Sequence, residues 1–360
     1  MPPVTTAALP SALEAAQILP PDAATSLALY STVVLPAEQA ALNAAHQLIH
    51  ARVVGYLLLY APSSHARRTL ESEVALCQTT RDPHPALFEI GAKYVRHLIV
   101  LFRESRGRTP TPSDDPSQPA SDPPGQDLLS DLQRVPRDHS SAKALALRRD
   151  AYRCMVTGRI DTDSFLAGLT TLVDGESPGS TNCCHIFPDS LGSINVAGAT
   201  EPRDREPATV WSILTRFGYQ DICEELDFAS TKANLHRLEN IMTLDVTVRD
   251  AFDQMNMWFE AIDGRENTYK IVLAAKVQRL AKFLTPEQVT FTSDHPELPL
   301  PSPKYLRVHA ACCRVAHMSG AAEHLDLIFR DMEDLKVLAH DGTSADVLSI
   351  ALHSHLAAVI

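Results

Sequence analysis

The chain has 360 residues, of which 45% are hydrophobic and 21% are charged, and its formal net charge is −12 at pH 7. This composition is ordinary for a globular protein of one large domain or two to three smaller ones, and no stretch approaches the ~20 apolar residues that a membrane-spanning helix needs. The acidic balance argues against broad, non-specific binding of nucleic acid. We therefore expect any contact with DNA or RNA to be confined to a local basic patch.

The cysteines and the N-terminus bear on the compartment. The chain has seven cysteines and no CxxC pair, which suggests neither a disulfide framework nor a four-cysteine zinc site. Its first residues, MPPVTTAALP, lack the positive region of a secretory signal. We expect an intracellular protein, cytoplasmic or nuclear, with no membrane association.

Residues 1–105 are expected to form an N-terminal helical region. Apolar residues recur at three-to-four spacing over 37–60, which predicts one helix. Ser63 can cap a second helix over 63–77, and a third fits 85–104. We expect these helices to serve packing.

A linker is predicted over 106–141, because the stretch RGRTPTPSDDPSQPASDPPG is rich in Pro, Ser and Asp and cannot bury a core. A short helix is expected near 127–135. The central module is placed at 142–268. The last region, 269–360, is expected to be mostly helical after short strands. Its predicted helices cover 304–318, 321–339 and 344–360.

Three phrases of the central module carry chemistry: LRRDAYRCMVTGR at 147–159, TNCCHIFPDS at 181–190 and RLENIMTLDVTVRDAFDQMNMWFEA at 237–261. The first predicts a helix end near Asp150 and a strand at Met155. The second predicts a strand stopped by Pro188, which lacks a backbone donor. The third predicts a strand over 241–244, then a helix with apolar residues from Val248 to Phe259 on one face.

This arrangement suits metal-assisted phosphodiester hydrolysis. An imidazole such as that of His185 can accept a proton from an attacking water. A divalent ion can neutralise the charge that builds on the phosphate and the leaving oxygen. The side chain of Asn240, with its donor and acceptor groups, can hold the imidazole in one orientation.

The phrases YRCMVTG, CHIFPDS, LENIMTLDVTVRDAFD and MWFEA resemble those of fungal HNH-nuclease-domain proteins, and the likeness extends over roughly residues 50–350. The resemblance implies an α+β fold with a central ββα-metal (HNH-like) module, flanked by N- and C-terminal helices. A helical insertion, expected at 207–219 and 221–228, separates the two catalytic strands. The implied activity is a metal-dependent endonuclease that hydrolyses nucleic-acid phosphodiesters with Mg²⁺, Mn²⁺, Zn²⁺ or Ni²⁺.

The motif carries over residue by residue. His185 matches the general base and Asn240 the asparagine that orients it. The last motif histidine should precede the pair Phe252-Asp253 by three residues, and that position is Arg249. Arginine stays protonated and cannot donate a lone pair to a metal ion.

Three interpretations of Arg249 stay open. The module can be a degenerate, catalytically inactive scaffold that holds no metal and acts as an interaction protein. Other ligands can serve instead; we select Cys184 and Asp253 as metal ligands, and His236, Asp245 and Asp250 are further candidates. Arg249 can itself contact phosphate, which suits a guanidinium. A pocket reused for other chemistry is a further alternative.

Two other groups of residues have competing interpretations. Arg148, Arg149, Arg153 and Arg159 surround the first predicted strand and form either the local basic patch or a solvated face. The residues His309, Cys313 and His317 share one helix face. Ligand spacing is possible there, but packed helix surface is the preferred interpretation.

Overall fold

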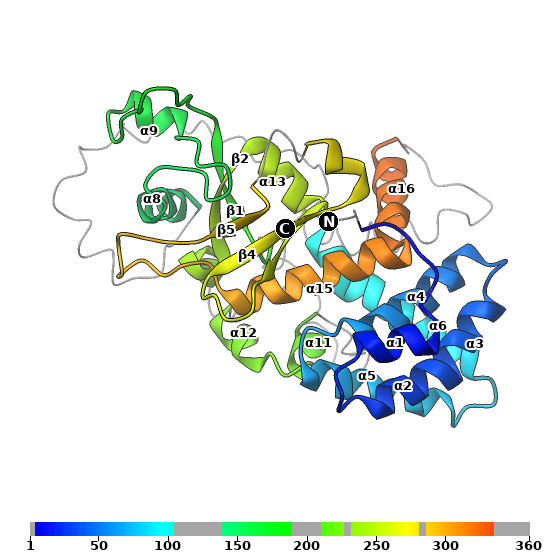
Figure 1. The fold of residues 1–360 in the computed structure, drawn as a ribbon. Coiled ribbons are helices and arrows are strands. Elements are labelled where there is room, and N and C mark those ends of the chain that lie inside the picture. Colours follow the sequence, from blue (N-terminus) through cyan, green and yellow to red (C-terminus); the bar gives the residue numbers. More distant parts are fainter. Residues whose placement is uncertain (1–3, 104–138, 189–209, 227–231, 281–285, 335–360) are drawn as a thin grey trace, which may run out of the picture.

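The computed structural model describes residues 4–103, 139–188, 210–226, 232–280 and 286–334. In these ranges the protein is α+β, as predicted, with helices around two small antiparallel sheets (Figure 1). None of the helices in these ranges is long and apolar enough to cross a membrane. The predicted linker up to residue 138 and the helices expected at 127–135 and 344–360 lie outside the described residues.

The N-terminal region is helical, as predicted. Ser63 caps α5 (Ser64–Cys77) by accepting a hydrogen bond from the Ala66 N–H at 3.0 Å. The single helix expected over 37–60 is two helices, because the chain turns at 41–44 and α4 (Ala45–Leu59) packs against α3 (Leu35–Ala40). The elements are α1 (Ala12–Ile18), α2 (Ala24–Leu29), the π-helix η1 (Tyr30–Val34), α3 (Leu35–Ala40), α4 (Ala45–Leu59), α5 (Ser64–Cys77), α6 (Pro83–Tyr94), η2 (Val95–Ile99) and η3 (Val100–Phe102).

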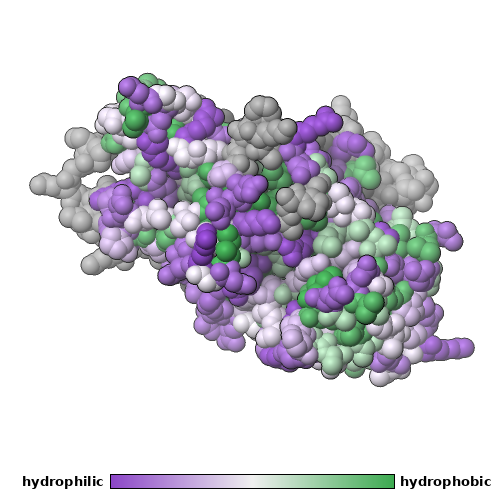
Figure 2. All heavy atoms as spheres, viewed as in Figure 1, coloured by the Kyte–Doolittle hydropathy of each residue, from purple (hydrophilic) through white to green (hydrophobic). Residues whose placement is uncertain are grey.

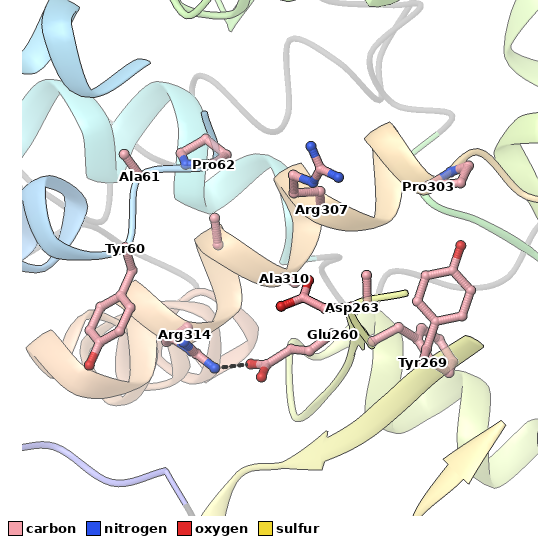
Figure 3. Close-up of a pocket in the computed structure, with 13 residues that line it drawn as sticks. Tyr60, Ala61, Pro62, Glu260, Asp263, Tyr269, Pro303, Arg307, Ala310 and Arg314 are labelled. Carbon is pink, nitrogen blue, oxygen red and sulfur yellow. Dashed lines mark hydrogen bonds and ion pairs between the residues drawn. The ribbon is translucent and has the colours of Figure 1, made fainter. Parts of the chain in front are cut away.

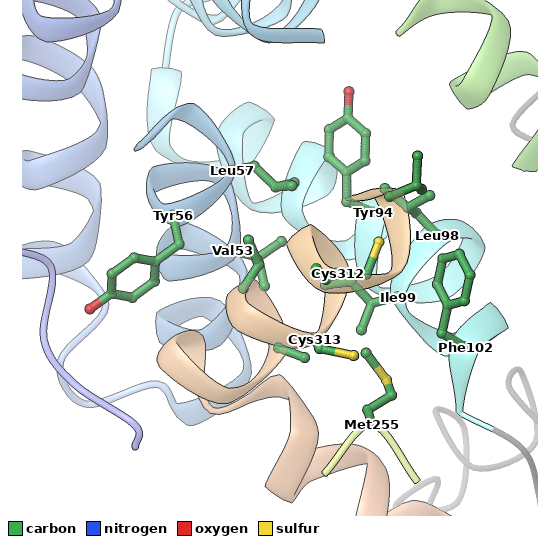
Figure 4. Packing of buried hydrophobic residues seen from close by; sticks show 14 of the residues in the cluster. Val53, Tyr56, Leu57, Tyr94, Leu98, Ile99, Phe102, Met255, Cys312 and Cys313 are labelled. Carbon is green, nitrogen blue, oxygen red and sulfur yellow. The ribbon is translucent and has the colours of Figure 1, made fainter. Parts of the chain in front are cut away.

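Apolar side chains gather on the surface over these N-terminal helices, whereas most of the remaining visible face is hydrophilic (Figure 2). Leu13 of α1, for example, is 74% exposed. Beneath this surface, Val53 and Leu57 of α4 pack with Cys312 and Cys313 (Figure 4). One apolar core therefore joins the N-terminal helices to the C-terminal region.

The central sheet is a two-stranded antiparallel ladder, in which β1 (Thr181–His185) pairs with β2 (Ile241–Asp245) and His185 lies opposite Ile241. Because side chains alternate along a strand, Cys183 and His185 share one face and Cys184 lies on the other. Helix α8 (His139–Arg149) packs on the first face. Helix α13 (Val246–Asp253) follows β2 directly and packs on the second, where Cys184 lies.

Two local predictions in the central module are wrong. Residues 155–157 form a turn instead of a strand, although the Met155 N–H still donates to Thr243 O at 2.9 Å. Helix α13 ends at Asp253, because Met255 takes a left-handed conformation (φ 58°) and reverses the chain. Trp258 therefore lies in a strand. The sequence did not reveal this, because a buried apolar run fits helix and strand periodicity equally well.

That strand, β3 (Met257–Ala261), begins a second antiparallel sheet with β4 (Thr268–Leu273) and β5 (Gln288–Thr290). The long helix α15 (Pro303–Ser319) packs against β3 and α4 and runs through the middle of the molecule (Figure 1). The remaining elements are α9 (Thr162–Leu166), η4 (Lys232–His236), η5 (Leu238–Asn240), η6 (Ala275–Leu280) and α16 (Ala321–Asp334).

The predicted insertion contains α11 (Val210–Arg216) and α12 (Gln220–Glu225), which confirms its two helices. It docks on the N-terminal helices: the buried Glu73 carboxylate pairs with Arg216, and the Tyr219 hydroxyl donates to Pro62 O at 2.9 Å. The domain boundaries at 105/106, 141/142 and 268/269 stay predictions.

His309 of α15 is part of the core. Its ring is 1% exposed and stacks on Phe252 with 4.0 Å between the ring centroids. Burial lowers the pKa of His309 to about 3, against an ordinary value of 6.5. Between pH 6.5 and pH 3 the unfolded chain binds a proton that the folded protein excludes, so stability falls as the pH falls through this window.

We predict that His309→Leu flattens this dependence. Between pH 7 and pH 5 the variant should lose roughly 2 kcal/mol less stability than the wild type, since it removes one buried imidazole. Urea unfolding at both pH values measures the difference. Equal losses in the two proteins would show that His309 is not excluded from protonation.

Candidate functional site

Three imidazoles from three elements meet at the end of β1. His185 is half-buried at the last position of the strand, and its Nε2 lies 3.1 Å from Nδ1 of His236 at the end of η4. The ring of His139, at the start of α8, lies 5.8 Å from that of His185 and 6.4 Å from that of His236, measured between centroids. His236 was among the candidates from sequence, whereas His139 was not.

A nitrogen and sulfur donor set lies at the same place. His139, Cys183 and His185 each offer one ligand atom, and these atoms all lie within 4.8 Å of one another. Imidazole nitrogen and thiolate sulfur are the donors that Zn²⁺ prefers, usually in a set of four. These residues therefore fit a borderline-soft divalent ion better than they fit Mg²⁺, which prefers oxygen.

The electrostatics keep the donors in defined protonation states. Burial, with the neighbouring rings of His236 and His139, lowers the pKa of His185 to about 3, so this imidazole is neutral at physiological pH. Its lone pair is available, but a proton acceptor works best with a pKa near the operating pH. Burial raises the pKa of the Cys183 thiol to about 12. A bound cation would have to displace its proton.

Asn240 is completely buried and fixes the backbone on both sides of this cluster. Its Oδ1 accepts from the Phe187 N–H at 2.8 Å, and its Nδ2 donates to Phe187 O at 3.0 Å and to Leu235 O at 2.9 Å. None of these bonds is to the imidazole of His185. Asn240 therefore positions His185 and His236 through the main chain.

The selected pair Cys184 and Asp253 also meets, but on the other face of β1. The Cys184 Sγ donates to Asp253 Oδ1 at 3.3 Å, and Asp253 Oδ2 accepts from Arg249 Nε at 2.9 Å. Burial raises the pKa of Asp253, while the Arg249 guanidinium acts in the opposite direction. A metal ion at this pair would have to displace Arg249, since the guanidinium already supplies a cation to the carboxylate.

The arginines of the expected basic patch are mostly paired. Arg149 is buried and bonds with both its guanidinium edges to Asp150 and to the backbone oxygens of Leu238 and Ile241. Arg153 pairs with Glu176, and Arg159 pairs with Asp245, a candidate ligand that also caps α13. These charges are therefore not free to bind a phosphate backbone without exchange of partners.

Comparisons of the chain with protein-family models, curated proteins and solved structures found no match.

We predict that Asn240→Ala lowers the free energy of unfolding by about 3 kcal/mol or more, because three buried backbone groups lose their partner. Asn182→Ala, at a half-buried position of β1, is the matched control and should change stability by less than ~0.5 kcal/mol. Chemical denaturation measures both. Similar losses in the two variants would contradict the positioning role of Asn240.

Proposed function

We propose that the protein is an HNH-like, metal-dependent endonuclease that hydrolyses nucleic-acid phosphodiesters and that binds its metal ion with His139, Cys183 and His185. The convergence of these three donors beside His236 is the observation that carries the proposal. The order β1, β2, α13 is in keeping with the resemblance to a ββα-metal module. An intracellular location, cytoplasmic or nuclear, belongs to this proposal.

The histidine, cysteine and asparagine residues of the site have different roles in the proposed reaction: metal binding, proton transfer and positioning. His139, Cys183 and His185 hold a divalent ion, which when bound would neutralise charge on the phosphate and the leaving oxygen. His236 lies within hydrogen-bond distance of His185 and either fixes that ring or accepts the proton of the attacking water. Asn240 holds both histidine-bearing segments in place.

In the proposed enzyme, Arg249 contacts a phosphate group of the substrate. Its side chain is 23% exposed, and its Nε donates to Asp253. A guanidinium binds phosphate through two parallel N–H groups.

The proposal is tested by metal titration and plasmid cleavage on the same protein preparations. We predict that the wild type binds Zn²⁺ in calorimetry and that His139→Ala and His185→Ala each weaken binding at least ~10-fold. Cleavage with Mg²⁺, Mn²⁺, Zn²⁺ or Ni²⁺ should be lost in His185→Ala. His84→Ala, on α6, is the control and should match the wild type. Equal cleavage by wild type and His185→Ala would refute the mechanism.

One observation favours a second candidate function, a non-catalytic scaffold that binds a partner. The ion pair between Arg249 and Asp253 closes the position where the motif expects a histidine ligand. On this alternative the wild type cleaves no plasmid with any of the four ions. Arg249→His, which places an imidazole beside Asp253 and Cys184, should then increase metal binding. No increase would indicate that the position has lost more than one ligand.

A further inference from the structure

A second site lies between α15 and the sheet of β3 and β4. A cavity of about 500 Å³ opens there, and the end of α4 at Tyr60 forms its third side (Figure 3). Its size falls within the range of small-molecule sites, roughly 300–1,000 Å³. None of the residues that line it belongs to the histidine cluster at β1.

At one end of the cavity, the charged side chains pair with each other. Arg314 forms an ion pair with Glu260, and the Trp258 Nε1–H donates to the same carboxylate at 2.8 Å. The Arg314 guanidinium also lies 4.8 Å from the centroid of the Tyr60 ring. These charges and this ring form a fixed wall and need no ligand.

The other end contains polar groups that have no partner within the described residues. Arg307 and Asp263 are both exposed, and neither side chain forms a hydrogen bond or an ion pair in that part of the chain. Tyr269 is 2% exposed, and its hydroxyl has no hydrogen-bond partner among the residues that the structure describes. A buried hydroxyl without a partner is costly, and an incoming acceptor would recover that cost.

The walls between these groups are apolar and aromatic. Tyr60, just after the end of α4, contributes a partly exposed ring, and Ala310 leaves space on the helix side (Figure 3). The rings of Phe259 and Tyr269, which are 1% and 2% exposed, line the sheet side. Rings of this kind accept the flat, apolar part of a ligand. The cavity therefore combines an apolar surface with one cation, Arg307, and one anion, Asp263, that are unpaired within the described part of the chain.

We propose that this cavity binds a small zwitterion with an apolar body, of the class of the aromatic α-amino acids. Arg307 and the Tyr269 hydroxyl donate to the ligand carboxylate, and Asp263 accepts from its ammonium group. The lining has two cations, Arg307 and Arg314, and two anions, Glu260 and Asp263, so it is electrically balanced. A simple anion would leave Asp263 unpaired, and a simple cation would leave Arg307 unpaired.

Three probes of one skeleton test the proposal by calorimetry on the full chain at neutral pH: phenylalanine, 3-phenylpropanoate and 2-phenylethylamine. We expect phenylalanine to bind with a Kd on the order of 1 mM, since the site is open to solvent and small. The probes that lack the ammonium or the carboxylate should bind at least 10-fold more weakly. Equal binding of the three, or no binding of phenylalanine, would overturn the proposal.

Variants assign the two charges. Arg307→Gln and Asp263→Asn should each weaken phenylalanine binding at least 10-fold, and Asp263→Asn should also abolish the preference for phenylalanine over 3-phenylpropanoate. Arg68→Gln, an exposed arginine on α5 outside the cavity, is the matched control and should bind as the wild type does. Circular dichroism of each variant verifies the fold. Unchanged binding in Arg307→Gln would assign the site elsewhere. The readout involves no cleavage, so it is independent of the proposed nuclease.

Discussion

The arrangement of the central region depends on one buried amide. The side chain of Asn240 bonds to the backbone of Phe187, just after β1, and to that of Leu235, just before the end of η4. These two positions lie on either side of the insertion, so the hydrogen bonds of a single side chain hold the two ends of the inserted segment together. The consequence is the 3.1 Å contact between His185 and His236, which lie 51 positions apart in sequence. The β1–β2 ladder, in which His185 lies opposite Ile241, supports the same contact.

The alternation of β1 then separates two sets of polar groups. Cys183 and His185 point to the face that α8 covers, where His139 adds a third donor. Cys184 points to the face of α13, where Asp253 is already paired with Arg249. A guanidinium and a metal ion compete for the same carboxylate, which disfavours a metal ion on the second face. For this reason we propose a metal site at His139, Cys183 and His185 instead of at Cys184 and Asp253.

Ion pairs within the protein reduce the number of arginine side chains that can bind a nucleic acid. The chain is acidic overall, and Arg149, Arg153 and Arg159 each have a carboxylate partner within the molecule. Binding a phosphate backbone through Arg153 or Arg159 would require an exchange of partners, which reduces the net gain. The buried Arg149 instead joins α8 to the backbone of Ile241 at the start of β2. Its role is structural.

The sequence by itself determined the α+β class, the capped helix at Ser63, the two helices of the insertion and the position of His185 near the end of a strand. The α+β class was expected from the resemblance. The other three features are local, since caps, periodicity and proline act over a few residues. Only the tertiary structure decided that β1 pairs with β2 and that the segment after Met255 is a strand. It also decided that His139, which lies within the predicted linker 106–141 but begins α8, is close to His185. Such contacts join residues that are distant in sequence. A short sequence pattern therefore does not show which metal donors lie on the same face of the sheet, or which carboxylate forms an ion pair with which arginine.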